Sequence, residues 1–191
     1  MSLTRGLVLD VANQLGGAMP GVVTLHDWSR EKNDGAMANV TWVQLASTGL
    51  WVMVFNGTTA EVPHAASTVL CQSFIAWIYP DDKTTRSIAD FDGGTHSVEM
   101  DAAGNLTATG WAAPSLYVTG SVASAAITES AWNFIAVTTA TAFTASAVTL
   151  GHEATWFDGN MALVSLFNYV LSPAQIRARF HSTKWLFGVA S

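Results

Sequence analysis

The segment Gln72–Tyr79, QSFIAWIY, is the most informative one about the fold. Side chains of a β-strand alternate between two faces, and both faces of this stretch are apolar: the even-numbered positions from Phe74 to Ile78 and the odd-numbered positions from Ile75 to Tyr79. A strand that is apolar on both faces is buried on both. We therefore expect this strand in the centre of a sheet, with a packing layer on each side.

Two further runs have the same character. Trp132–Thr139 reads WNFIAVTT, and Met161–Asn168 reads MALVSLFN after the predicted turn Asp158-Gly159-Asn160. His96–Met100 and Leu106–Thr109 flank a loop whose Gly and Asn suit a hairpin. Short strands separated by turn residues, without alternating helices, predict an all-β sandwich or barrel.

A single helix is predicted near the end of the chain. In Ser172-Pro173-Ala174-Gln175, Ser is suited to the N-cap, Pro to the first helical position and Gln to the reciprocal capping contact. We expect a short helix from here to about Phe180.

The composition limits the class of protein. A length of 191 residues suits one domain, residues 1–191, and charged residues make up 12%, against about 25% in typical domains. Either the core is large or a partner covers part of the surface.

A net charge of −6 without a basic stripe argues against nucleic acid as a partner, and no apolar run reaches the roughly 18 residues of a membrane span. No signal peptide is recognised at the start. Cys71, the only cysteine, is expected to be a small buried residue.

The last third of the chain resembles laminin G-like domains of the concanavalin A-like lectin and glucanase superfamily. Phe157-Asp158-Gly159-Asn160 is followed by a core strand and then by Leu171-Ser172-Pro173-Ala174, as in that family. Earlier segments agree in order and spacing: Asp27-Trp28-Ser29, Asn33-Asp34-Gly35, Phe55-Asn56-Gly57, Glu61-Val62-Pro63 and Phe74–Ile78. The resemblance covers about residues 5–180. It implies a two-sheet antiparallel jelly roll with one short C-terminal helix, whose rim loops or concave face bind ligands.

Calcium is the one cofactor that the resemblance raises. Many relatives carry an Asp in the last strand, associated with a structural calcium, where this chain has Ala162. Asp27, Asp34 and Asp158 are oxygen donors in predicted loops, the ligand type that calcium prefers. The alternative is that these residues form turns. We favour the turns and expect no cofactor.

No catalytic set is recognised. Hydrolases of the same fold use Glu-x-Asp-x-x-Glu; the nearest match is Glu99-Met100-Asp101, without the second Glu. We read Glu99 as a solvated strand residue and Asp101 as a turn former. The five His show no metal-binding spacing, and G-x-S-x-G is absent from the sequence. The chain is therefore expected not to be an enzyme.

Two tryptophans are candidates for glycan binding. Trp28 and Trp111 lie beside turn residues, where an exposed ring offers an apolar platform for a sugar. The alternative is that both rings are partly buried in the sandwich or in an interface.

Two main function hypotheses follow. The first is a structural or surface-decoration protein of a symmetric or homo-oligomeric assembly, such as a virus or phage particle, located on the virion surface. Its tail Trp185-Leu186-Phe187 would then contact a neighbouring protein. The alternative is a carbohydrate-binding or adhesion module, extracellular or at a cell surface. A divergent glycoside hydrolase is the third and weakest reading.

Overall fold

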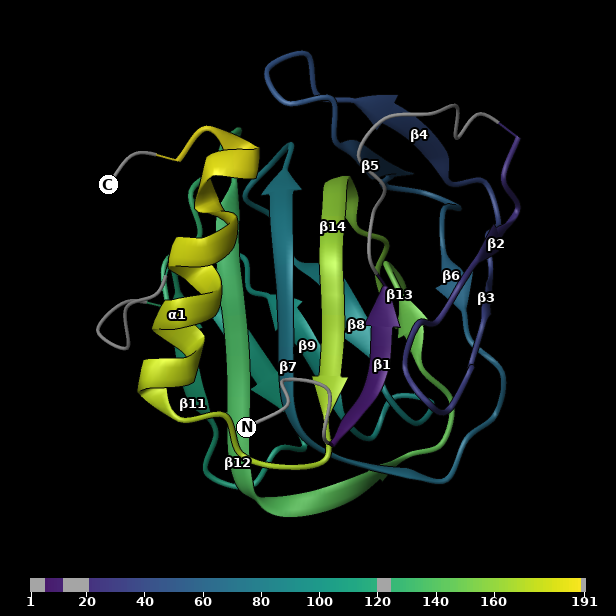
Figure 1. The fold of residues 1–191 in the computed structure, drawn as a ribbon, viewed down its shortest axis with the longest axis vertical. Coiled ribbons are helices and arrows are strands. Elements are labelled where there is room, and N and C mark those ends of the chain that lie inside the picture. The colour runs from purple at the N-terminus through teal and green to yellow at the C-terminus, as the bar shows by residue number, and fades with distance from the viewer. Residues whose placement is uncertain (1–5, 12–20, 120–124, 190–191) are drawn as a thin grey trace.

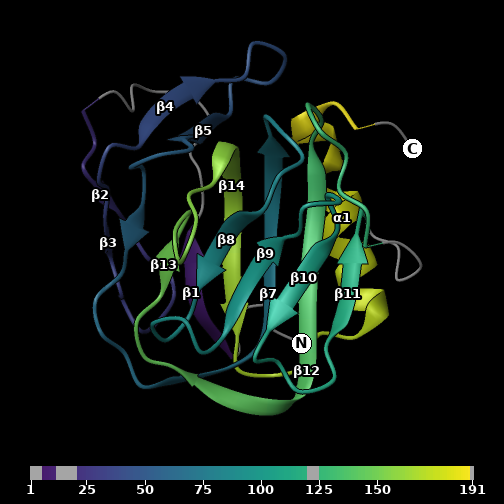
Figure 2. The same cartoon turned by 180° about the vertical axis from the view of Figure 1, so that it is seen from behind.

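The protein is a sandwich of two antiparallel sheets with one helix on its outer face (Figure 1). The computed structural model describes residues 6–11, 21–119 and 125–189. Figure 2 shows the same molecule from behind, where the smaller sheet lies in front. The fold class predicted from the sequence is confirmed.

The larger sheet, called the large sheet below, contains the longest strands. Its order is β11 (Ser115–Val118), β12 (Asn133–Ala145), β7 (Val69–Pro80), β14 (Asp158–Phe167), β5 (Trp51–Asn56) and β4 (Thr41–Gln44). β1 (Leu7–Val11) pairs with the second half of β14, where β5 no longer does. β1 therefore extends this edge of the sheet.

The second sheet closes the sandwich. Its order is β10 (Leu106–Thr109), β9 (Ser97–Met100), β8 (Arg86–Asp90), β13 (Thr149–Leu150) and β6 (Val62–Pro63). A separate pair, β2 (Thr24–Leu25) and β3 (Gly35–Ala36), lies beside these sheets. The predicted hairpin is present as β9 and β10, and the Asp101 carboxylate accepts backbone hydrogen bonds from Ala103 and Asn105 in its turn.

β7 lies between β12 and β14 and is buried on both faces, as expected. Phe74 and Ile78 belong to the core between the two sheets. Trp77 points to the opposite face, where the rings of Phe180 and Phe187 lie 5.8 and 4.3 Å from its own ring. The second packing layer is thus the C-terminal segment. Cys71 is buried in the core, and burial raises the pKa of its thiol.

The C-terminal segment begins as predicted and ends later. α1 spans Pro173–Thr183 and η1, a 3-10 turn, spans Lys184–Phe187. The Ser172 hydroxyl accepts from the Gln175 backbone, and the Gln175 side chain accepts from the Ser172 backbone. Such a cap stabilises a helix by about 1 kcal/mol. Among the described residues, no helix is long and apolar enough to cross a membrane.

The predicted turn at Asp158-Gly159-Asn160 is wrong. These residues begin β14, where Asp158 pairs with Asn56 and Gly159 with Pro80. The glycine is required by close approach, because a Cβ at Gly159 would lie 2.1 Å from the Tyr79 carbonyl oxygen and its φ is +131°. A glycine between Asp and Asn indicated a turn, whereas in the fold it allows two backbones to approach each other.

Candidate functional site in a groove on the large sheet

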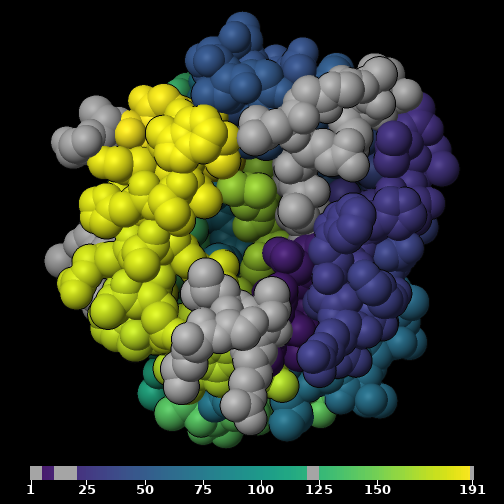
Figure 3. Space-filling model, viewed as in Figure 1, coloured from purple at the N-terminus to yellow at the C-terminus, as the bar shows by residue number. Residues whose placement is uncertain are grey.

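The outer face of the large sheet is hollowed between α1 and β1. Figure 3 shows this hollow between the yellow helix and the purple strand. The cavity has a volume of about 160 Å³. Polar side chains of Asp10, Ser165 and Arg179 line it above a floor of Ile75, Trp77 and Phe134, and we call it the sheet groove. An apolar floor with a few convergent polar groups is typical of small-ligand sites.

A β-bulge in β14 turns Ser165 toward the sheet groove. The pairing of β14 with β7 shifts between Ala162 and Ser165, and Leu163 has a φ of +50°. Met161 faces the core, so regular alternation would point residues 163 and 165 inward as well. The extra residue reverses the alternation: Val164 faces the core and Ser165 lines the groove.

Asp10 lies opposite Ser165 on the neighbouring strand. The Ser165 hydroxyl donates a 2.9 Å hydrogen bond to Asp10 Oδ1. Burial raises the pKa of the Asp10 carboxyl, against the lowering effects of the Ser165 hydrogen bond and the Arg179 charge. Within the described ranges no protein group donates to Asp10 Oδ2. This oxygen is available to a ligand.

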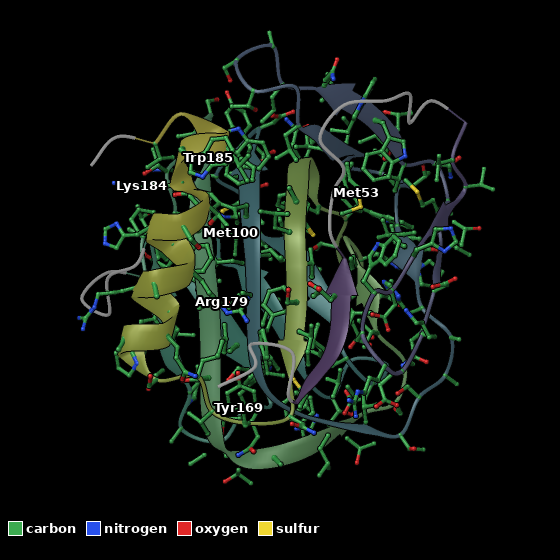
Figure 4. All side chains as sticks on the ribbon, viewed as in Figure 1. Met53, Met100, Tyr169, Arg179, Lys184 and Trp185 are labelled. Atoms are coloured by element: carbon green, nitrogen blue, oxygen red, sulfur yellow. The ribbon has the colours of Figure 1, made fainter. Side chains whose placement is uncertain are left out.

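Arg179 reaches from α1 toward the sheet (Figure 4). Its guanidinium lies over the Phe167 ring, 4.6 Å from the centroid. The turn that carries it is held by two hydrogen bonds, since Trp77 Nε1 donates to Thr183 Oγ1, which donates to the Arg179 carbonyl.

Burial lowers the pKa of Arg179, although its interactions with Tyr169 and with the charge of Asp10 act to raise it. In the part of the chain that the structure describes, no carboxylate forms an ion pair with Arg179 and its guanidinium donates no hydrogen bond. A half-buried guanidinium whose donors are unused is a binding group for a ligand oxygen.

The predicted glycan residue Trp28 is connected to this site through the backbone. The Asp10 N–H donates to Asp27 Oδ1 at 3.0 Å, and the Trp28 N–H donates to the Asp10 carbonyl at 2.9 Å. The Trp28 side chain is 59% exposed, and Lys32 Nζ lies 5.7 Å from its ring centroid. The contact of Trp28 with a sugar stays a prediction.

Trp111 is not an exposed platform, and the alternative, burial of its ring in the sandwich, is confirmed. It is only 5% exposed, and its ring lies 5.5 Å from Phe91 and 4.9 Å from Phe143. The close backbone approach at Gly110, where a Cβ would lie 2.0 Å from the Thr95 carbonyl oxygen, directs the following residue into the core.

Asp27 is a structural residue rather than an open metal ligand. Its Oδ1 accepts from the backbone of Asp10 and Ser29, and its Oδ2 accepts from the Ser29 hydroxyl and the Asn33 backbone. Asp34 accepts from the Asp27 backbone and pairs with His26, and these bonds lower the pKa of Asp34. Both carboxylates hold the loop between β2 and β3.

The third predicted calcium ligand lies in a different cluster. Asp158 Oδ2 is 3.5 Å from Arg86, which also pairs with Asp82. No group of three or more His, Cys, Asp or Glu side chains able to hold a metal is found in the described residues. The predicted set Asp27, Asp34 and Asp158 is therefore not brought together, because two members lie in one loop and the third starts β14.

The predicted interface tail is mostly internal. Leu186 and Phe187 are only 8% and 7% exposed, and the Phe187 ring lies 4.5 Å from that of Trp132. The expectation that both contact a neighbouring protein is wrong, because the 3-10 turn folds them onto the large sheet. Trp185 is 59% exposed at the end of α1 (Figure 4).

Sequence reasoning missed Asp10, Ser165 and Arg179, three of the polar residues that line the sheet groove. A signal existed for two of them. Asp10 is the one charged residue in LVLDV, and Ser165 is the one polar residue in MALVSLF. A lone polar residue in an apolar strand requires a partner or a ligand. The partnership of Asp10 with Ser165 depends on the register of β1 against β14.

No protein-family model matches the sequence, and no curated protein matches it. Solved structures of similar fold exist. One is a mutant of Trypanosoma rangeli sialidase displaying trans-sialidase activity, at 14% identity and a TM-score of 0.60. Another is domain 4 of AbnA, an extracellular arabinanase of family GH43 from Geobacillus stearothermophilus, in complex with arabinotriose, at 12% identity and a TM-score of 0.59. A third is the ligand-binding domain of botulinum neurotoxin serotype D in complex with N-acetylneuraminic acid, at 9% identity and a TM-score of 0.57.

The matches cover most of this chain and different shares of the others. The match with the sialidase includes 98% of this chain and 34% of the sialidase. The corresponding shares of this chain and of the other chain are 90% and 97% for the arabinanase domain, and 94% and 51% for the neurotoxin domain. The chain thus spans about a third of the sialidase and half of the neurotoxin domain. At these identities the likeness shows the fold, a β-sandwich consistent with the jelly roll that the sequence resembles.

Proposed function

We propose that this protein is a carbohydrate-binding domain and that the sheet groove is its sugar site. The observation that carries the proposal is the juxtaposition of Arg179, Asp10 and Ser165 above the apolar floor. Sugar hydroxyls both donate and accept hydrogen bonds, whereas the C–H faces of a sugar ring are apolar. Arg179 supplies donors and Asp10 an acceptor, so the groove matches both properties.

The comparisons support this choice among the functions that the fold can carry. The arabinanase domain and the neurotoxin domain were solved in complex with arabinotriose and N-acetylneuraminic acid. A fold hosts many functions, and the site decides between them. The polar groups of the sheet groove therefore carry more weight than the likeness.

We further propose that binding is not followed by hydrolysis. A retaining glycosidase needs two carboxyl groups about 5 to 5.5 Å apart. Asp10 is the one carboxylate among the described residues that line the groove. Glu99 lies on β9 in the other sheet, where its oxygens accept from the hydroxyls of Ser97 and Thr109. Incubation with polysaccharides should release no reducing sugar.

The test is a glycan array followed by isothermal titration calorimetry of the full chain. The variant Arg179→Gln should weaken the binding of any sugar found by about tenfold or more, the worth of a hydrogen bond to a charged group. Arg177→Gln is the matched control, because Arg177 is exposed on the same helix. Equal loss in both variants, or none in either, contradicts a sugar site in the groove.

The structural role in a larger assembly is our second proposal, with the surface of a virus or phage particle as its location. The observation that favours it is the exposed Trp185 ring, since tryptophan is enriched among the residues that contribute most to protein–protein binding. Light scattering of the protein and of Trp185→Ser tests it. A wild-type oligomer that becomes monomeric in the variant is the expected result, and a monomeric wild-type protein contradicts it.

A further inference from the structure

We propose that the sugar held in the sheet groove is an acidic one, whose carboxylate binds the guanidinium of Arg179. This inference rests on the proposed function and names the class of its ligand. It follows from the ion pairs and hydrogen bonds that Arg179 and Asp10, the two charged residues of the groove, form or lack within the described structure.

Among the residues that the structure describes, Arg179 has no anionic partner in contact. Its guanidinium is half-buried over the Phe167 ring, and among the described residues it has neither an ion pair nor a hydrogen-bond acceptor. Removing a cation from water costs free energy, and an opposite charge offsets this cost when its geometry is good and the hydrogen bonds of both groups are satisfied. The planar guanidinium fork matches a carboxylate through two parallel hydrogen bonds. A ligand carboxylate supplies both the charge and the geometry.

Asp10 does not supply this anion. It lies farther from Arg179 than the 4.0 Å of an ion pair, and its Oδ1 is bound to the Ser165 hydroxyl. The charged groups that face Asp10 in the described structure are Arg179 on α1 and Asp27 in the neighbouring loop. Burial raises the pKa of Asp10, so this carboxyl binds a proton more readily than an exposed one.

An acidic ligand and a neutral ligand therefore have opposite pH dependence. A ligand carboxylate adds a negative charge beside Asp10, so Asp10 takes up a proton and then donates a hydrogen bond. By linkage, binding of an acidic sugar strengthens as the pH falls, while the ligand carboxylate stays ionised. A neutral sugar uses Asp10 as a charged acceptor, and its binding weakens as the pH falls.

The experiment uses two matched pairs of probes, D-glucuronate with D-glucose and D-galacturonate with D-galactose. Each pair differs in a carboxylate at one carbon. Calorimetry of the full chain at about pH 7 and about pH 5 should show at least one acid that binds about tenfold or more tighter than its neutral partner, and tighter at the lower pH.

Two variants assign this preference to Arg179. Arg179→Gln should bring the affinities of the acid and its neutral partner close together, and Arg179→Lys should keep part of the preference, because it retains the charge without the fork. Arg177→Gln should bind as the wild-type protein does. Thermal unfolding of each variant shows whether it is folded, and the wild-type comparison of the paired sugars stands without any variant.

The outcomes separate this inference from the proposed function. If in both pairs the neutral sugar binds at least as tightly as its acid, or if the acid is preferred equally in Arg179→Gln, the acidic-ligand inference is overturned while the sugar site stands. If no glycan on the array and none of the four probes binds, the proposed function fails and this inference fails with it.

Discussion

The Asp10 N–H donates a hydrogen bond to the Asp27 carboxylate, yet the two carboxylates differ in how their own oxygens are bonded. Asp27 is only 2% exposed, and both of its oxygens accept hydrogen bonds from within the protein. Asp10 has one oxygen bound by Ser165 and another without a protein donor in the described chain. A carboxylate whose acceptors are all used holds a loop together, whereas one with an unused acceptor is available to a ligand. Four substitutions test this difference, beginning with the one that should change stability most.

Replacing the saturated carboxylate should have the largest effect on stability. Asp27→Ala leaves the donors of Asp10, Ser29 and Asn33 without their acceptor, and a buried donor left unpaired costs about 1 to 3 kcal/mol. We expect the free energy of unfolding in urea to fall by about 3 kcal/mol or more. Asp27→Asn keeps one acceptor and should lose less. A loss below about 1 kcal/mol for Asp27→Ala contradicts a structural role.

Removing the hydroxyl that binds Asp10 should have an intermediate effect. Ser165→Ala deletes the 2.9 Å hydrogen bond that lowers the pKa of Asp10. We expect a loss of about 1 kcal/mol of stability, together with a further rise in the Asp10 pKa. NMR titration of the carboxyl carbon measures this rise. An unchanged Asp10 pKa shows that the hydrogen bond is not formed in solution.

Replacing the unsaturated carboxylate should slightly stabilise the protein at neutral pH. The folded-state pKa of Asp10 is raised, so the stability contributed by its protonated form is present at low pH and is lost as the pH rises through the folded pKa. Asp10→Asn removes this loss, and we expect a gain of up to about 0.5 kcal/mol at pH 7 and none at low pH. Unfolding curves at both pH values provide the check, and a loss at pH 7 contradicts it.

The exposed Trp28 side chain, whose backbone N–H binds the Asp10 carbonyl, should matter least for stability. Trp28→Ala removes a side chain that is 59% exposed, so we expect a change within about 0.5 kcal/mol. The same variant should weaken sugar binding if the Trp28 ring contacts the sugar, as predicted from the sequence. Calorimetry with the sugar found on the array measures the affinity of the variant. Unchanged affinity shows that Trp28 does not contact the sugar.

Much of the fold was predictable and much of the candidate site was not. Strand 72–79, the hairpin at Asp101 and the Ser172 cap depend on local patterns, and the structure confirms them. Trp111 and Phe187 look like surface residues in the sequence because they lie next to a turn or near the terminus. The fold buries both. Their burial depends on the close approach at Gly110 and on the η1 turn, which are contacts between distant segments.

The two-sided apolar strand, the sandwich built around it and the capped helix follow from the sequence alone, because side-chain periodicity and capping act over a few residues. The sheet groove was decided only by the tertiary structure. A bulge at Leu163 changes which face Ser165 occupies, the register of β1 places Asp10 opposite it, and α1 brings Arg179 from another part of the chain. No local pattern encodes these three placements, because each depends on how separate segments pack.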